Sequence, residues 1–398
     1  MTAAENGHGR VRICAVIYWL ERGGAERVLS TLCNEWAALE QDVTVVTVAA
    51  ASHTEFGLSS AVARQSLTPT KAAGGLSRRT RPLRRLRQLR STIQALNPDV
   101  VVSFGDRTNV MTLLALVNTS IPVVVSERTD PRRIPLTWIM ERVRSVTYHR
   151  AAAIALQTQS VLPWAQQRFP TLRTRVIPNP VAPAQTHALS GARNPYITCV
   201  ARFSQEKGVD VLIDAFARAG VRASGWRLHL VGDGPLRSQL EAQVRELGIS
   251  DSVVFHGRVH DPEAYLVASQ IAVLPSRVEG FPNALLEAMA AGTAVISTDC
   301  ESGPSEIVTH GIDGLLVPTD DPDALATAIV TLTSDPELRK RLGHAGASVT
   351  TRFAPQAISE AWLSLFREVA STTAATRSRR PRPSHDSPER AARIDHSP

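Results

Sequence analysis

The sequence predicts an α/β protein made of two doubly wound domains that face each other across a cleft. Its 398 residues are enough to build two hydrophobic cores. Two series of short apolar runs, each typical of a buried parallel strand, alternate with helix-forming segments. A polar segment rich in Ala and Pro, residues 183–195, separates the two series. We therefore expect a first domain over residues 1–182 and a second over residues 196–354.

The first apolar run, residues 11–18, predicts a central strand, and a helix ending near Leu39 follows it. Gly23 and Gly24 lie between them, where a glycine pair lets the backbone approach a ligand closely. A tight strand-to-helix turn explains the pair equally well, and the spacing is not that of a dinucleotide fingerprint. Further strands of this domain are expected over residues 42–48, 61–67, 99–104, 122–126 and 151–156.

Residues 76–96 predict a basic amphipathic helix, with Thr80 as the N-cap and Pro82 in the first turn. One face carries Leu83, Leu86, Leu89, Ile93 and Leu96, and the opposite face carries Arg81, Arg84, Arg85 and Arg87. An ordinary solvated face is one interpretation. However, seven Arg and no acidic residue occur over residues 78–90, which favours an anionic partner such as a lipid-linked diphosphate or an anionic membrane surface. No aromatic residue is interleaved for base stacking, so nucleic acid is not expected.

The net charge of +7 is unevenly distributed. The Arg-rich helix contributes +7 and the tail from Arg377 contributes +3, so the rest of the chain carries −3. Residues 371–398 are rich in Ser, Pro, Arg and Ala and are expected to be disordered. No apolar run is long enough to span a bilayer, and the N-terminus lacks an apolar signal core. We therefore expect a cytoplasmic protein, peripheral on the inner face of the cytoplasmic membrane.

The second domain is expected to begin with a strand at residues 196–200, followed by Arg202 and Lys207. Both cations would reach a phosphate at the carboxyl end of that strand, unless they are simply surface charges on a loop. Four more strands are expected over residues 228–232, 253–257, 271–274 and 294–297, and helices over residues 322–332, 336–346 and 355–370. The four Cys have no metal-ligand spacing, so neither disulfides nor structural zinc are expected.

Two carboxylates, Glu279 and Glu287, follow the strand at residues 271–274. Between them a Gly-Phe-Pro turn leads into a helix that begins at Pro282 or Asn283 and ends at Gly292. Two Glu at this spacing are often surface charges, but a carboxylate inside such an apolar helix requires a partner. The free N–H groups at the start of the helix are also suited to bind a phosphate.

The pattern Glu279-Gly-Phe-Pro-Asn-Ala-Leu-Leu-Glu287, followed by Gly292 and Gly311-x-x-Gly314, resembles the donor-site signature of family-4 retaining glycosyltransferases. The resemblance extends over nearly the whole chain and implies the B-type glycosyltransferase fold, with the helix at residues 355–370 crossing back to the first domain. It implies transfer of a hexose or N-acetylhexosamine from a nucleotide-diphosphate sugar, such as a UDP-sugar. No Asp-x-Asp motif is positioned for a metal, so neither a metal nor another cofactor is expected.

The resemblance also implies roles for individual residues. Glu287 would bind the ribose hydroxyls of the donor, and Glu279 would position the transferred sugar. Arg202 and Lys207 would stabilise the departing diphosphate, which Gly23 and Gly24 would face across the cleft. The remaining donor contacts are expected from Gly232, Arg258, Gly280, Phe281, Pro282, Asn283, Ala284 and Leu285.

The segment SERTDP, residues 126–131, is similar to the subgroup that adds N-acetylhexosamine to polyprenyl-diphosphate-linked oligosaccharides. Many family members have a His near this point, where this chain has Glu127 and Arg128, so a role for that His is not carried over. We expect a lipid-linked glycan acceptor, used in the synthesis of cell-surface polysaccharide or glycan. The residues expected to bind it are Glu127, Arg128, Arg84, Arg85 and Arg87, and a local Glu127–Arg128 ion pair is the alternative. A nucleotide-sugar epimerase of the same fold and a non-enzymatic adaptor for anionic membranes are the alternative functions.

Overall fold

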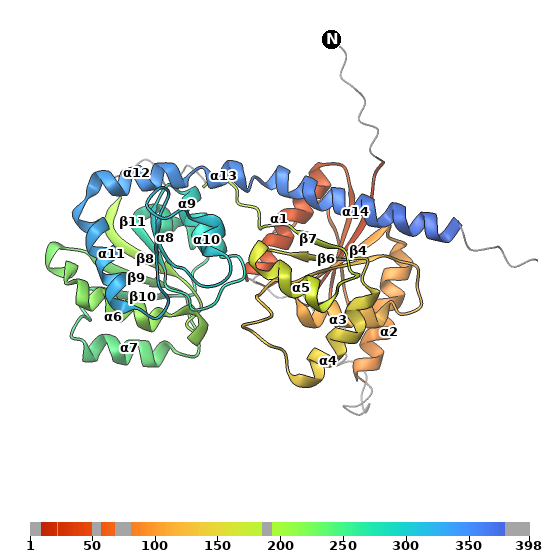
Figure 1. The fold of residues 1–398 in the computed structure, drawn as a ribbon, viewed down its shortest axis with the longest axis horizontal. Helices are drawn as coiled ribbons and strands as arrows, with labels where there is room; N and C mark the ends of the chain where they lie inside the picture. Colours follow the sequence, from red (N-terminus) through yellow and green to blue (C-terminus); the bar gives the residue numbers. More distant parts are fainter. Residues whose placement is uncertain (1–8, 22, 50–56, 68–80, 185–192, 379–398) are drawn as a thin grey trace, which may run out of the picture.

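The computed structural model describes residues 9–21, 23–49, 57–67, 81–184 and 193–378 of the chain. It confirms the fold class, because two α/β units lie side by side and each is built on one sheet of parallel strands (Figure 1). Among the described residues no helix is long and apolar enough to cross a membrane.

The sheet of the first domain has the strand order β3-β2-β1-β4-β5-β6-β7. Its strands are β1 (Arg12–Ile17), β2 (Asp42–Thr47), β3 (Ala63–Ser66), β4 (Val100–Phe104), β5 (Val123–Ser126), β6 (Ala153–Leu156) and β7 (Thr174–Val176). Its helices are α1 (Gly24–Ala38), α2 (Arg81–Leu96), α3 (Asp106–Ala115), α4 (Trp138–Thr147) and α5 (Leu162–Arg168).

Helices cover both faces of this sheet, which explains why its central strands are apolar throughout. On β1, Ile13 and Ala15 pack toward α1, while Cys14 and Val16 pack toward the α2–α3 side. Successive side chains of a strand point to opposite faces of the sheet, and here both faces are buried.

The second sheet has the order β10-β9-β8-β11-β12-β13. Its strands are β8 (Asn194–Val200), β9 (Arg227–Val231), β10 (Val253–Gly257), β11 (Ser269–Leu274), β12 (Ala294–Thr298) and β13 (Leu315–Val317). Its helices are α6 (Val209–Ala219), α7 (Arg237–Glu246), α8 (Glu263–Ala268), α9 (Asn283–Ala290), α10 (Pro304–Ile307), α11 (Pro322–Ser334), α12 (Pro336–Gly346) and α13 (Val349–Arg352).

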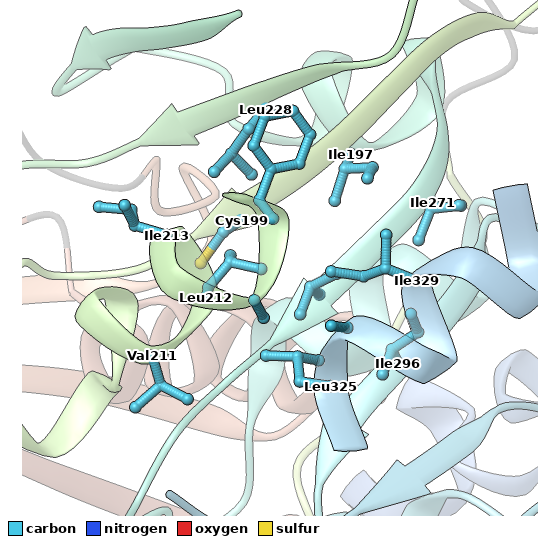
Figure 2. Packing of buried hydrophobic residues seen from close by; sticks show 14 of the residues in the cluster. Ile197, Cys199, Val211, Leu212, Ile213, Leu228, Ile271, Ile296, Leu325 and Ile329 are labelled. Carbon is cyan, nitrogen blue, oxygen red and sulfur yellow. The ribbon is translucent and has the colours of Figure 1, made fainter. Parts of the chain in front are cut away.

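The core of the second domain lies mainly between this sheet and α6 and α11 (Figure 2). Ile197 and Ile271 come from its two central strands, and Leu212 and Leu325 come from the helices that pack on these strands. All four side chains are fully buried. Such a core holds the carboxyl ends of the central strands in fixed positions, and the candidate site is built there.

The C-terminal helix α14 (Pro355–Ser378) leaves the second domain and lies along the first (Figure 1). Trp362 and Phe366 on this helix pack against Trp36 of α1, with ring centroids 6.2 and 5.2 Å from it. The predicted crossing is therefore present, and it joins the two domains through an apolar contact.

Two expectations about local structure are wrong. Helix α14 continues through residues 371–378, which were expected to be disordered, and Thr372 and Thr373 donate back to the carbonyls of Glu368 and Val369. On α2, Leu89 and Ile93 are buried as predicted, but Leu83 is 59% exposed because the first turn of the helix lies outside the core cluster. Arg78, Arg79, Thr80 and residues 379–398 lie outside the described residues.

Candidate functional site

The strand order of the second sheet reverses between β8 and β11. Open α/β sheets bind ligands at such a point, beyond the carboxyl ends of the strands. Lys207 follows β8 and Glu279 follows β11, so two of the three predicted catalytic residues, the third being Arg202, approach this point from opposite sides. Their side chains meet there, with Lys207 Nζ 2.7 Å from Glu279 Oε1.

Two glycines allow these loops to approach closely. Gly208 has a φ of +61°, and a Cβ atom on it would lie 2.1 Å from the Pro275 carbonyl oxygen. Gly232 has a φ of +144°, and its Cβ would lie 1.9 Å from the Ala201 carbonyl oxygen. No other residue type fits at these distances, so the glycines bring the loops after β8, β9 and β11 together.

The Glu279 carboxylate is held in one position by neighbouring side chains. Only 9% of the residue is exposed, and the same Oε1 atom accepts hydrogen bonds from Lys207 and from the Ser276 hydroxyl at 2.7 Å each. Charge-assisted hydrogen bonds of this length are strong. Glu279 therefore presents an oriented carboxylate, while Lys207 places a positive charge beside it.

Helix α9 begins at Asn283, and its N-terminus faces the N-terminus of α1 in the first domain. The Asn283 amide donates to the Gly24 carbonyl at 3.0 Å, which brings the predicted glycine loop to the predicted phosphate-binding helix. Gly23 is the N-cap of α1. Two helix N-termini in this arrangement create positive potential suited to a diphosphate.

Asn179 was not predicted as a site residue, yet it joins the two domains at this point. It is buried, its Nδ2 donates to Asn283 Oδ1 at 2.6 Å and to the Phe281 carbonyl at 3.2 Å, and its Oδ1 accepts from Arg128 at 2.5 Å. The only sequence signal was its position between two prolines, Pro178 and Pro180. From the sequence, such a segment indicates only the end of the first domain.

Glu287 lies one helix turn further along α9 and contacts Arg27 of α1. Arg27 Nη1 is 2.9 Å from Glu287 Oε1, and Arg27 Nη2 is 3.4 Å from Glu263. Burial raises the pKa of the Glu287 carboxyl to about 7, while Arg27 lowers it and Glu263 and Asp261 raise it further. The predicted need for a partner is met by Arg27, which the sequence did not identify.

The other predicted donor residues divide into three groups. Phe281 and Leu285 point into the core of the second domain, where Phe281 packs edge-on against Phe353. They can contact a ligand only through their backbones. Arg202 and Arg258 are exposed at the ends of β8 and β10. Gly280 accepts a hydrogen bond from Ser302 through its carbonyl, Pro282 caps α9, and Ala284 lies in its first turn.

A cavity of about 290 Å³ opens beside Glu279, between the domains. The first domain contributes Asp130 and Arg133, and Arg133 forms an ion pair with Glu301 across the interface. The second domain contributes Arg277, Val278, Glu279, Asp299, Cys300, Glu301, Ser302 and Thr319. A lining of carboxylates, guanidinium groups and hydroxyls is suited to a ligand with many hydroxyl groups.

Glu127 does not line this cavity. It is 2% exposed, accepts a hydrogen bond of 2.5 Å from Tyr148 and lies 3.6 Å from Arg144, inside the first domain. Burial raises the pKa of its carboxyl to about 7. A carboxylate at that depth cannot reach an acceptor, so the predicted contact is wrong, and the alternative ion pair with Arg128 is not formed either.

Arg128 points the other way, toward the domain interface. Its guanidinium donates to Asn179 and lies 4.8 Å from the ring centroid of Phe104. Burial lowers the pKa of Arg128 to about 9. The two adjacent residues therefore have different roles. Glu127 forms polar contacts inside the first domain, and Arg128 approaches the site.

The predicted arginines on α2 are also not equivalent. Arg84 and Arg87 are exposed. Arg85 is half-buried, with its Nη1 atom 3.3 Å from the Tyr18 hydroxyl and its guanidinium over the same ring at 5.9 Å. Of these three arginines, Arg84 and Arg87 are therefore fully available to an anionic surface.

Family models match both domains. Residues 22–185 match the model described as Glycosyltransferase Family 4, and residues 194–335 match the model described as Glycosyl transferases group 1. Together the two matches include Arg27, Asn179, Lys207, Glu279 and Glu287.

Two curated relatives and one solved structure illustrate what the chain is similar to. The GalNAc-alpha-(1->4)-GalNAc-alpha-(1->3)-diNAcBac-PP-undecaprenol alpha-1,4-N-acetyl-D-galactosaminyltransferase of Campylobacter jejuni is 27% identical over 363 residues, which is 90% of this chain and 99% of that protein. An exopolysaccharide phosphotransferase of Streptomyces coelicolor is 38% identical over 223 residues, which is 55% of this chain but 24% of that protein. Anabaena HepE in complex with UDP superposes with a TM-score of 0.71 at 20% identity, over 92% of this chain and 100% of that one. This last likeness concerns the fold alone.

Proposed function

This chain belongs to the glycosyltransferases with the two-domain B-type fold, and we propose that it transfers a hexose or N-acetylhexosamine from a UDP-sugar to a lipid-linked glycan. The observation that carries the proposal is the paired Lys207 and Glu279 beside the opposed N-termini of α1 and α9. This arrangement combines positive potential for a diphosphate with an oriented carboxylate for a sugar, which is what a nucleotide-sugar requires.

In the proposed reaction the donor diphosphate lies between the starts of α9 and α1, within reach of Lys207 and Arg202. As the glycosidic bond breaks, negative charge develops on the departing diphosphate, and fixed positive groups stabilise it without reorganising. The acceptor hydroxyl adds on the same face of the sugar, so that the anomeric configuration is retained. The departing phosphate takes the hydroxyl proton, and no further base within the protein is needed.

Glu279 and Glu287 have separate roles in this proposal. Glu287 accepts hydrogen bonds from the ribose hydroxyls, which requires Arg27 to give up or share the carboxylate. Glu279 accepts from a hydroxyl of the transferred sugar and fixes its orientation toward the cavity. That cavity, with Asp130 and Glu301 from opposite domains in its lining, is where the acceptor glycan would approach.

The acceptor class is proposed from the charges of the first domain and from one relative. The Campylobacter protein, matched over nearly its full length, is named for an undecaprenyl-diphosphate-linked substrate. Arg84 and Arg87 are exposed on α2 and would face the diphosphate of such an acceptor and nearby anionic lipid head groups.

A donor panel tests the proposal. The protein is incubated with UDP-, GDP- and ADP-sugars, and thermal stability is measured, since a ligand that binds only the folded state raises the melting temperature. Release of nucleoside diphosphate and the anomeric configuration of the product are then measured with a lipid-linked acceptor. We expect stabilisation by a UDP-sugar and a retained configuration.

The same assay tests the expectation that no metal is needed. Among the described residues no cluster of His, Cys, Asp and Glu is placed to hold a cation. Turnover should therefore persist in excess chelator. If chelator abolishes turnover and magnesium or manganese restores it, the expectation that no metal is needed is wrong. Release of a sugar epimer without transfer would overturn the whole proposal.

A further inference from the structure

Helix α4 carries apolar side chains on both of its faces. Met140 and Val143 pack toward the core of the first domain. On the outer side Trp138 is 70% exposed, Ile139 64% and Val146 69%, and these are the three most exposed large apolar side chains among the described residues. A helix that is apolar all round is normally buried on all sides.

The outer side chains of α4 form one patch. Trp138, Arg142 and Val146 follow one another at four-residue spacing, Ile139 lies beside them, and Ile134 is 41% exposed in the turn just before the helix. We call these five residues the α4 patch. Single exposed apolar residues are ordinary, but a contiguous group rimmed by polar residues marks an interaction surface. Figure 1 shows α4 at the periphery of the first domain.

The charge around the α4 patch is positive. Residues 132–150 contain five Arg and one Glu. Arg144 is buried against Glu127 and Glu141, and Arg132 and Arg133 are paired with Asp130 and Glu301, so the positive charge beside the patch comes from Arg142 and Arg150. The guanidinium of Arg142 lies over the Trp138 ring, 5.2 Å from its centroid, and Arg150 is exposed at the end of the segment. On the same side of the sheet, α2 adds the exposed Leu83, Arg84 and Arg87.

This combination of groups identifies the occupant. Trp favours the boundary between head groups and acyl chains, arginine binds lipid phosphate, and aliphatic side chains enter the acyl region. A second copy of this chain fits less well, because a two-fold contact would place Arg142 and its neighbours against the same cations of the partner.

We propose that the α4 patch inserts into the interface of an anionic phospholipid bilayer and docks the first domain on the membrane. The loop of residues 127–137 runs from β5 to this helix and carries Asp130 and Arg133, which line the cavity beside Glu279. Docking through α4 would hold that cavity next to the membrane. This consequence rests on the proposed function, whereas membrane binding does not.

The test uses the full chain and sedimentation with vesicles, without donor or acceptor. The wild type should bind vesicles that contain phosphatidylglycerol and bind phosphatidylcholine vesicles weakly. Replacing Trp138→Ser together with Ile139→Ser should lower the partition coefficient on anionic vesicles by about tenfold or more, since it removes the inserting side chains. The matched control, Ile312→Ser with Val330→Ser, removes exposed apolar side chains from the second domain and should leave binding unchanged.

Depth-dependent quenching locates the contact. Among the described Trp residues only Trp19 and Trp138 are strongly exposed, so brominated lipids should quench wild-type fluorescence. Trp138→Phe should keep binding and lose most of the quenching, while Trp19→Phe should keep both. Melting temperature and nucleotide-induced stabilisation confirm that each variant is folded.

The proposal is overturned if the double Ser variant binds anionic vesicles like the wild type, or if Trp138→Phe leaves quenching intact. It is also overturned if light scattering shows a dimer that the double variant abolishes, because the α4 patch would then be a subunit interface. Failure of the donor panel with intact vesicle binding would reject the proposed function and leave this inference standing.

Discussion

In the second domain, close packing of the backbone fixes the residues predicted to face a ligand. In the first domain, several of the residues predicted to face a ligand have exposed side chains instead. Lys207 and Glu279 are brought together by loops that approach within contact distance at Gly208 and Gly232. Arg84 and Arg87 of α2 are not held by such packing, because their side chains are exposed to solvent.

This difference corresponds to the two kinds of ligand proposed for the chain. A nucleotide diphosphate has a fixed shape, and a site that stabilises a transition state must be ordered beforehand. A lipid surface has no fixed shape, and exposed cations and apolar groups suffice to bind it. Changes in the second domain should therefore affect catalysis most, while changes in the first should affect encounter with the acceptor.

The largest effect is expected at Lys207. Lys207→Ala removes the cation proposed for the departing diphosphate and leaves the Glu279 carboxylate with Ser276 alone. We expect kcat to fall by roughly 10²–10³-fold, the equivalent of about 2–4 kcal/mol of transition-state stabilisation. Arg202→Ala should cost a comparable amount, toward the lower end because Arg202 is exposed. Steady-state kinetics measure this, with Lys340→Ala as the control. Full turnover in Lys207→Ala would remove the main support for the donor site.

Substitutions of Glu287 and Glu279 should have different effects, one on UDP binding and the other on turnover. Glu287→Gln should weaken UDP binding by roughly 10-fold or more, since a hydrogen bond to a charged group contributes about 1.5–3 kcal/mol. Glu279→Gln should leave UDP affinity nearly unchanged and depress turnover, because its proposed partner is the transferred sugar. Calorimetry with UDP and single-turnover kinetics compare them. Equal loss of UDP affinity in both variants would contradict the division of roles.

A pH dependence follows from the buried position of Glu287. Burial raises the pKa of this carboxyl to about 7, so it becomes neutral as the pH falls through that value. A neutral carboxyl accepts weaker hydrogen bonds, and UDP affinity should fall by up to about tenfold for each pH unit below the pKa. UDP titrates as well, so the informative quantity is the difference between the wild type and Glu287→Gln. Identical slopes in the two proteins would show that Glu287 does not titrate in binding.

Much of the fold, and the meeting of Lys207 with Glu279, could be predicted because both depend on local pattern. Apolar runs gave the parallel strands, and ligands bind at their carboxyl ends, which placed Lys207 and Glu279 together. Arg27 and Asn179 were missed because their significance arises only when α1 and the Pro178–Pro180 segment meet α9 across the interface. Glu127 was misplaced for a related reason, since nothing in its sequence context identifies Tyr148 and Arg144 as its partners.

The α4 patch was missed for the opposite reason. Helical periodicity identifies apolar residues but not which of two apolar faces the domain covers. Met140 and Trp138 are equally apolar in the sequence, and only the position of α4 beside α3 decides which of them is exposed. Exposure of an apolar face is a property of the assembled domain.

The smallest effect is expected from the arginines of α2. Each Arg near an anionic surface contributes about 1 kcal/mol, and salt screens this contribution. Changing Arg84, Arg85 and Arg87 together to Gln should therefore impair use of a lipid-diphosphate acceptor several-fold at low salt and less at physiological salt. Arg84→Gln with Arg87→Gln should account for most of the effect, because Arg85 is held against Tyr18.

Acceptor turnover and UDP affinity are measured for these variants and for Arg227→Gln with Arg245→Gln, which removes two exposed charges from the second domain. UDP affinity and slow donor hydrolysis should remain unchanged throughout, because the proposed donor site is built mainly from the second domain. Added salt should reproduce the α2 variants in the wild type. If the triple variant uses the acceptor normally at low salt, α2 is only a solvated face. Membrane contact would then depend on the α4 patch alone, and comparing the salt dependence of vesicle binding with that of turnover would distinguish the two surfaces.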